Sequence, residues 1–353
     1  MAKIIAPIWK DTFATLATDG SAVPFRIYAG NETEPTTGGP IYEGLCSPRP
    51  DGRAVIRLND IAADYLVHTL PRLSDAAFTA LTFPVYFYIF RYASGGWYWD
   101  QSDDCYGFLM DWSYDPDRTT ADRMSCPVDG GVSRNQYLLF TALNVPAISA
   151  DLTFDDGTTQ TVTIQLAHGA DFDASFSRDF ARSLQTAGSG TAVFMPSTYD
   201  SAARKVVAVT VNGEEYDVVD PCERYVLYYL NAFGGWDSLL VQGHTRRTDA
   251  LERSTVETAY DNNGITNRGR RDYAIGIERC YAFNTHILTD AQSERMHHLL
   301  ESPDVYFHDL ETGLIRPLVL TGSDCVFQDF RSNGARMSQY EIAATVAQSF
   351  ERR

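Results

Sequence analysis

The sequence lacks the short motifs that mark the commonest catalytic and nucleotide-binding sites. It contains no G-x-x-x-x-G-K-[ST], and no G-x-G-x-x-G between a strand and a helix, so phosphate-cradling loops are not indicated. It also has no H-E-x-x-H and no G-x-S-x-G, which excludes the usual zinc-protease and nucleophile-elbow patterns. We therefore expect that the protein is not an enzyme, with no catalytic residues and no cofactor.

Long apolar runs and clustered positive charge are also missing. No stretch approaches the roughly 18 apolar residues of a membrane span. Lys and Arg number 29 against 46 Asp and Glu, a formal net charge of −17. Because nucleic acids and anionic membranes attract clustered cations, we expect neither as a partner. Only six residues separate Lys3 from Lys10, too few for the apolar region of a signal peptide, so we expect none.

Metal-binding patterns are weak. The six cysteines have no C-x-x-C spacing, which favours reduced thiols in a protein made in cytoplasm. His297 and His298 are adjacent on a predicted helix and point in different directions, so they are poorly placed to hold one ion. The acidic stretches 111–117 and 171–173 lack the glycine and the closing Glu of a calcium loop. We interpret them as solvated turns and expect no metal.

The residues present in abundance indicate β structure. Aromatic residues make up 12% of the chain, and Tyr and Phe suit half-buried pleated surfaces. Residues 152–166 alternate around Asp156-Gly157, and residues 204–219 surround Asn212-Gly213. Such dipeptides between alternating segments are typical of β-hairpins.

These signals predict a mainly β fold of tandem antiparallel β-sandwich or barrel domains. Residues 1–81 are expected to form a β segment with a short helix, Asp60–Leu70, capped by Asn59. Residues 82–223 resemble an immunoglobulin-like or fibronectin-like sandwich in strand spacing. Residues 224–353 are expected to be an α+β domain, which could pack with residues 1–70. Its single flanking helix, 290–302, starts with a capping box at Thr289 and Gln292.

The junction between the last two ranges contains the most apolar strand. Residues 225–230 are apolar on both faces, so we expect cover on both sides. The strand breaks at Gly234-Gly235 and resumes at residues 238–241. Phe233, Gly234, Gly235 and Trp236 are our candidates for a contact between domains or subunits, and ordinary core aromatics are the alternative. The polar stretches 31–40 and 244–272 are expected to be loops that reach neighbouring subunits.

A second cluster combines aromatic rings with carboxylates. Trp97, Trp99 and Asp100 lie in the stretch SGGWYWDQSDD, residues 94–104. Aromatic faces beside carboxylates are used to bind sugars, and paired carboxylates 5–10 Å apart could serve a glycosidase. A structural or subunit-contact role is the third interpretation. The residue pattern leaves all three open.

One segment resembles virion proteins of Bacteroidetes phages and prophages. Residues 222–237, CERYVLYYLNAFGGWD, are similar to a pattern of Cys, two residues, Tyr, an aromatic strand, Asn, Gly-Gly and an aromatic residue. Residues 49–52 (RPDG) and 58–66, with Leu58-Asn-Asp-Ile61 and Tyr65-Leu66, also resemble the start of such proteins. The resemblance covers about a third of the chain.

The resemblance implies a structural subunit of a phage tail, neck or baseplate. Such a subunit would be made in the bacterial host cytoplasm and end up in the virion. Its partners would be copies of itself and other virion proteins. The alternative hypothesis is a carbohydrate-binding protein or adhesin that uses Trp97, Trp99 and Asp100, with a glycan as ligand.

Overall fold

The structure of the chain is a computed structural model. Its strands lie in several sheets whose pairings are almost all antiparallel, which confirms the predicted mainly β fold. It describes residues 4–8, 11–30, 39–66, 68–74, 77–80, 85–98, 105–110, 112, 131–145, 147–165, 188–219, 224–257, 270–322, 326–332, 335–347 and 350–352.

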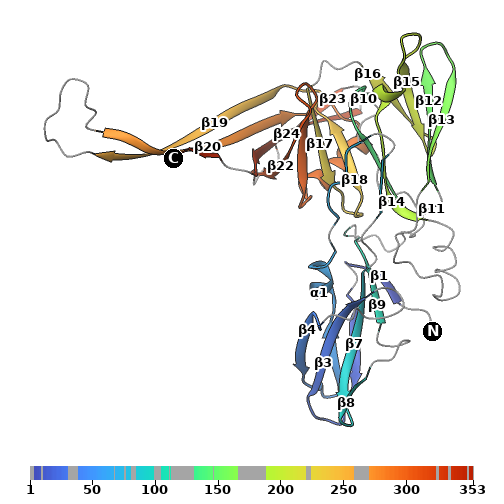
Figure 1. The fold of residues 1–353 in the computed structure, drawn as a ribbon, viewed down its shortest axis with the longest axis vertical. Helices are drawn as coiled ribbons and strands as arrows, with labels where there is room; N and C mark the ends of the chain where they lie inside the picture. Colours follow the sequence, from blue (N-terminus) through green and yellow to red (C-terminus); the bar gives the residue numbers. More distant parts are fainter. Residues whose placement is uncertain are drawn as a thin grey trace. The chain divides into compact units, whose positions relative to one another are not determined.

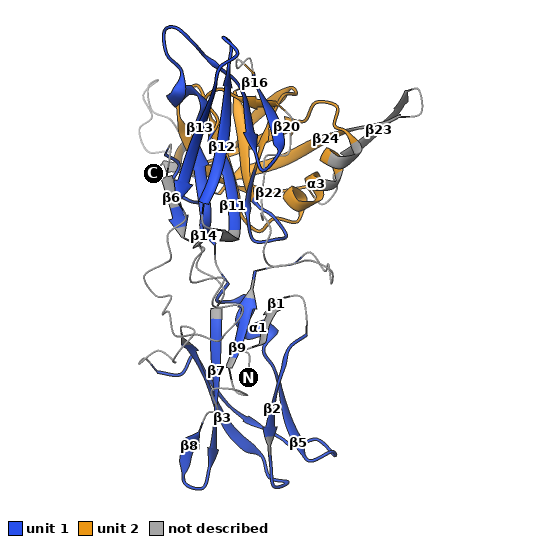
Figure 2. Cartoon of the chain, turned by 90° about the vertical axis from the view of Figure 1, so that its right-hand side faces the viewer, with its two compact units in different colours: residues 1–127, 137–218, 230–237 blue, residues 128–136, 219–229, 238–353 orange. Residues whose placement is uncertain are grey.

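The chain divides into two compact units, and each is built from separate stretches of sequence (Figure 2). Unit 1 contains residues 1–127, 137–218 and 230–237, and unit 2 contains residues 128–136, 219–229 and 238–353. The chain therefore passes between the units several times. Strand β10 (Gly131–Ser133) is a short element of unit 2 that comes from the middle of the sequence.

The first part of unit 1 is a sheet with the strand order β1, β9, β7, β3, β4, with β8 paired to β7. Strand pairing crosses the expected boundary between residues 81 and 82, because Ile27 of β3 lies opposite Ile89 of β7. Strands β2 and β5 form a separate pair. The bounds are β1 (Ile4–Pro7), β2 (Phe13–Ala17), β3 (Val23–Gly30), β4 (Tyr42–Cys46), β5 (Arg53–Arg57), β7 (Val85–Ala93), β8 (Gly96–Tyr98) and β9 (Cys105–Leu109).

The helix predicted at Asp60–Leu70 is shorter than expected. Helix α1 spans Asn59–Ala63, and its N-cap residue is Leu58, which makes no side-chain cap hydrogen bond. The prediction that Asn59 caps the helix is wrong. Its buried side chain accepts a hydrogen bond from the Thr12 amide (2.8 Å) and donates one to the Ile8 carbonyl (2.5 Å). The Asn59 side chain thus forms hydrogen bonds with backbone groups that are distant in the sequence, and it does not cap the helix.

The second part of unit 1 contains two further groups of strands. One has the order β11, β14, β6 and the other includes β16, β15, β12, β13. The ring of Phe140 on β11 lies 5.9 Å from that of Phe194 and 6.1 Å from that of Tyr216 on β16, so the two groups face each other as in a sandwich. The bounds are β6 (Ala77–Ala80), β11 (Leu138–Val145), β12 (Ala147–Phe154), β13 (Thr159–Gln165), β14 (Gly188–Phe194), η1 (Pro196–Tyr199), β15 (Val206–Val211) and β16 (Glu214–Val219).

Both predicted hairpins are confirmed. Strand β12 pairs with β13 across a turn in which Gly157 has φ +79°, and Asp156 accepts hydrogen bonds from Thr158. Strand β15 pairs with β16, and Asn212 and Gly213 both have positive φ, as a type I′ turn requires. The turn dipeptides together with the flanking strand patterns therefore predicted these four strands.

Unit 2 is a large sheet with one helix, α3, against it, which confirms the predicted α+β arrangement. Its strand order is β18, β17, β21, β22, β24, β20, β19, while β23 pairs with β24 and β25 with β20. The bounds are β17 (Tyr225–Leu230), β18 (Trp236–Leu240), β19 (Thr245–Glu257), β20 (Arg270–Asn284), α3 (Asp290–Leu300), β21 (Val305–Asp309), β22 (Leu314–Leu320), β23 (Val326–Ser332), β24 (Ala335–Val346) and β25 (Phe350–Arg352).

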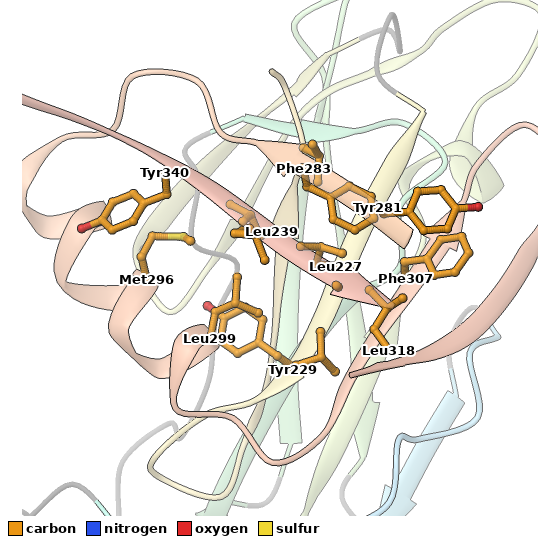
Figure 3. Close-up of a cluster of buried hydrophobic side chains, with 14 of the residues drawn as sticks. Leu227, Tyr229, Leu239, Tyr281, Phe283, Met296, Leu299, Phe307, Leu318 and Tyr340 are labelled. Carbon is orange, nitrogen blue, oxygen red and sulfur yellow. The ribbon is translucent and has the colours of Figure 1, made fainter. Parts of the chain in front are cut away.

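The core of unit 2 lies between α3 and one face of this sheet (Figure 3). Met296 and Leu299 of the helix are fully buried, and they share the cluster with Leu227, Leu239 and Phe307. The predicted capping box is present, because the Gln292 amide donates to Thr289 Oγ1 and the Thr289 amide donates to Gln292 Oε1. The cap fixes where the helix begins, and the apolar side chains fix which side faces the sheet.

The segment expected to break at Gly234-Gly235 is a hairpin. Strand β18 returns beside β17 rather than continuing it, and the turn is closed by a hydrogen bond from the Asn231 amide to the Gly235 carbonyl (2.8 Å). Residues 226–230 and 236–240 are all buried, as the apolar sequence predicted. The expectation of a turn at the two glycines is confirmed, and the expectation of one resumed strand is wrong.

Candidate functional site

The turn between β17 and β18 is held by one side chain. Asn231 Oδ1 accepts hydrogen bonds from the amides of Phe233 (3.0 Å) and Gly235 (2.9 Å). Gly234 has φ +78°, and a Cβ atom at that position would overlap the carbonyl oxygen of Met110. The turn therefore requires glycine both for its backbone conformation and for its packing.

Two buried side chains of unit 1 complete this site. The imidazole of His68 lies 2.8 Å from the Gly234 carbonyl and donates from Nδ1, since the oxygen only accepts. The ring of His68 also meets that of Trp236 edge-on at 6.2 Å. Burial lowers the pKa of His68 to about 4, against the opposing effect of the hydrogen bond to Gly234. His68 is thus neutral at pH 7.

The four predicted contact residues lie together, but mostly inside the chain. Trp236 has an exposed fraction of 0%, and its amide donates to Thr141 Oγ1. Gly234 and Gly235 are buried, while Phe233 is half-buried. The Trp236 ring is therefore a core aromatic of this chain, and Phe233 is the member of the group with exposed surface.

The predicted glycan cluster is only partly described. Trp99 and Asp100 lie outside the described residues. Trp97, on β8, is half-buried, and the Arg26 guanidinium lies 4.2 Å from its ring centre while Arg26 also pairs with Glu43. One face of the indole is thus engaged by a cation. Beside it, Tyr92 and Tyr98 are exposed by 44% and 46%.

Metal-ligating side chains do not gather in the described part of the chain. No group of three or more His, Cys, Asp or Glu residues there is placed to hold an ion. Cys46 and Cys280 are free thiols and half-buried. Within the same described ranges, no helix has the length and apolarity needed to cross a membrane.

The hairpin of β19 and β20 is an exposed feature of unit 2. Figure 1 shows the two strands leaving the rest of the sheet as a ribbon. We call residues 245–257 and 270–280 the arm. Among its residues with described side chains, none is buried. The prediction that 244–272 is a loop is wrong for residues 245–257 and 270–272, which are strand residues in a ladder that runs from Thr245–Phe283 to Glu257–Arg270. Residues 258–269 lie outside the described residues.

The arm carries charge pairs and exposed apolar side chains. Arg247 makes a two-pronged hydrogen bond to Asp249 (2.6 and 2.9 Å), and Arg253 pairs with Asp272 at 2.7 Å. The hydrogen bonds from Arg247 lower the pKa of Asp249. Leu251 and Tyr273 are exposed by 55% and 59%. Apart from Ile275–Ile277 and Cys280, which pair with β25 and β24, the described part of the arm is a two-stranded ribbon, and such a ribbon is only marginally stable by itself.

The sequence signal for this arm was incomplete. Residues 273–283 carry Tyr, Ile, Ile, Arg, Tyr and Phe at every second position, a pattern typical of a strand, and they lie in β20. Its partner β19, TRRTDALERSTVE, has no apolar alternation because neither of its faces is buried. Between the two strands the sequence Asp261-Asn-Asn-Gly264 has the composition of a turn, but the polar stretch around it led to the expectation of a loop.

The comparisons with known proteins give no relative. A scan against protein-family models and a search of curated proteins both found no match for this sequence. A proposal on function therefore rests on the structure of the chain and on the sequence resemblance.

Proposed function

We propose that the chain is a structural subunit of a bacteriophage particle, in the tail, neck or baseplate, which acts by assembling with itself and with other virion proteins. The observation that carries the proposal is the arm, formed by the 13 residues of β19 and by residues 270–280 of β20, whose described side chains are not buried in its own chain. A ribbon of that kind gains stability when a neighbouring molecule covers it.

The sequence supports the same proposal. Residues 225–237 of the segment that resembles phage virion proteins lie in the β17–β18 hairpin, whose turn is held by Asn231 and leaves no space for a side chain at Gly234. In this proposal the chain is made in the host cytoplasm, has no catalytic role and functions in the virion. Its excess of acidic residues keeps free subunits soluble before assembly.

The test is to look for the chain in particles. Particles released by lysis of the host that carries the gene would be purified on a density gradient and analysed by mass spectrometry and electron microscopy. We expect the chain to remain with the particles after a high-salt wash, at a fixed ratio to the major capsid protein. Its presence in the lysate together with its absence from washed particles would contradict the proposal.

Carbohydrate binding is the second candidate, and the exposed ring of Tyr92, which lies 5.4 Å from that of Trp97, favours it. A glycan array would be probed with the wild-type chain and with the Trp97→Ala/Trp99→Ala variant. Tyr273→Ala on the arm serves as a matched control, because it removes another exposed ring. No binding, or binding that the double variant retains, rejects this candidate.

A further inference from the structure

The outer strand of the arm is an open sheet edge. Strand β19 stands at the end of the strand order, and β20 is its only partner in the described part of the chain. Natural proteins protect such edges with very short strands, with Pro, with a bulge or with charged side chains, Lys above all. The charges of β19 are Arg, Asp and Glu. Strand β19 contains no Lys and no Pro, and the register shift near Ser254 places the extra residue, Tyr273, on β20. The edge is therefore regular over all 13 residues of β19.

We propose that β19 pairs antiparallel with β19 of a second copy of the chain, about a twofold axis at Leu251. This deepens the proposed function, on which it rests for self-assembly, and assigns one contact to a named strand. Leu251 is the midpoint of Thr245–Glu257, so pairing there engages the whole strand on both copies. The result is a continuous sheet from β20 through both copies of β19 to the second β20.

The charges of β19 are complementary to themselves in this register. With the axis at Leu251, Asp249 lies opposite Arg253 of the second copy, and the symmetry gives this pair twice. All these residues are exposed, so they are accessible to a partner. The two strands of the hairpin together carry six Arg against five Asp and Glu, whereas the whole chain has 29 basic and 46 acidic residues. The arm thus carries less repulsive charge than the chain as a whole.

Neighbouring registers are disfavoured by like charges. A twofold axis perpendicular to the sheet places side chains of the same face opposite each other. The axis therefore lies between the two copies of one residue, and not between two successive residues of a strand. An axis at Ala250 would place Arg247 opposite Arg253 of the second copy. An axis at Asp249, Glu252 or Arg253 would place that charge opposite itself. Among these central positions, Leu251 alone avoids directly opposed like charges.

The apolar side chains of the arm also continue across the new pair. Leu251 lies opposite Ile277 in the hairpin, and both are on the face that carries Tyr281 and Phe283 nearer the core. Across the dimer, the side chains would lie in the order Ile277, Leu251, Leu251 of the second copy and Ile277 of the second copy. Leu251, exposed by 55% in the single chain, would be covered from both sides. Burial of this row adds a hydrophobic contribution to the backbone pairing.

Charge reversal tests the register. Asp249→Arg alone and Arg253→Asp alone each turn both cross-strand pairs into like charges, whereas an equimolar mixture of the two variants restores both pairs. Sedimentation analysis of the full chain is expected to show a dimer, a dissociation constant at least about tenfold higher for each variant alone, and recovery in the mixture. The mixture also controls for damage to the pairs with Arg247 and Asp272 within each chain.

A cysteine at the axis tests the geometry. Directly opposed Cβ atoms in a sheet lie about 4.5–5.5 Å apart, so Leu251→Cys should form a disulfide-linked dimer under mild oxidation. Val256→Cys is the matched control on the same strand, with a similarly exposed side chain. Its two thiols would be roughly 34 Å apart in the proposed register, so no linked dimer above the wild-type background is expected.

The outcomes separate this inference from the proposed function. A strictly monomeric wild-type chain, variants that associate as the wild type does, or a mixture no better than its components would each overturn the β19 pairing. The presence of the chain in washed particles is measured independently, so the proposed function can stand when the β19 pairing fails. Dimer recovery in the mixture with absence from particles would support the pairing and reject the phage role.

Discussion

Gly234 and Gly157 share a backbone conformation but differ in their surroundings. Their φ values are +78° and +79°, yet a Cβ on Gly234 would overlap the Met110 carbonyl, whereas Gly157 has open space around it. Gly157→Ala should cost roughly 1–2 kcal/mol through backbone strain alone. Gly234→Ala should cost more than about 3 kcal/mol, because the β17–β18 turn must also move away from Met110.

Urea unfolding of the two glycine variants measures this difference. Equal losses of stability would mean that the turn moves freely and that the contact with Met110 contributes nothing. Such a result would leave the positive φ of Gly234 as the only reason for glycine at this point of the segment that resembles phage proteins.

His68 gives a pH dependence with a defined sign. Its pKa is lowered from 6.5 to about 4 by burial, so the unfolded chain takes up a proton before the folded chain does as the pH falls. Stability linked to His68 is therefore complete above pH 6.5 and is lost between pH 6.5 and 4, by roughly 3 kcal/mol in total. His68→Gln should flatten this part of the curve of unfolding free energy against pH.

The same substitution at the exposed His244 controls for the exchange itself. If His68→Gln leaves the slope between pH 6.5 and 4 unchanged, His68 is not the group responsible. His308 is shifted in the same direction by burial, so the comparison uses the difference between variant and wild type.

At the scale of elements, the start of α3 is set by two side chains. Thr289 Oγ1 accepts from the Gln292 amide, and Gln292 Oε1 accepts from the Thr289 amide. Thr289→Ala should destabilise the chain by about 1 kcal/mol, because an amide of the first turn loses its partner. Thr289→Ser keeps a hydroxyl and should stay within a few tenths of a kcal/mol of wild type. Thermal unfolding of both variants is the measurement, and equal melting temperatures for Ala and Ser would show that the cap is dispensable.

Strand β19 of the arm shows why some strands cannot be predicted from alternation of apolar residues. A strand is recognised by alternation when one of its faces is buried. Neither face of β19 is buried, so its sequence alternates only weakly, and the strand is specified by its pairing with β20. The β12–β13 hairpin was readily predicted because Leu152 and Ile164 are buried and a turn dipeptide lies between their strands.

At the scale of the whole molecule, each of the two units is built from segments that are separated in the sequence by segments of the other unit. Residues 128–136 belong to unit 2 although their neighbours on both sides belong to unit 1. Within unit 2, the buried Gln136 donates to Ser238 Oγ (2.9 Å) and accepts from the Ser133 amide. Residues 230–237 in turn belong to unit 1, where Gly234 and Trp236 meet His68 and Thr141.

Because the units are discontinuous in sequence, we expect the fragment of residues 224–353 to be less stable than the full chain. Residues 224–353, expected from sequence to form a domain, would lack Gln136, His68 and Thr141 while retaining their partners. We expect the fragment to be less stable than the full chain, since a buried Trp side chain alone contributes about 3–5 kcal/mol. Circular dichroism during heating is the measurement. A cooperative transition at the same temperature as in the full chain would show that 224–353 is self-sufficient.

The sequence by itself determined the features that depend on neighbouring residues. The turns at Asp156-Gly157 and Asn212-Gly213, the cap of α3 and the mainly β class follow from local backbone and side-chain chemistry. Tertiary structure alone decided the role of Asn59, the return of β18 beside β17, the pairing of β3 with β7 and the exposure of the β19 edge. These features depend on contacts between residues that are far apart in the sequence, and such contacts leave no local pattern from which they could be predicted.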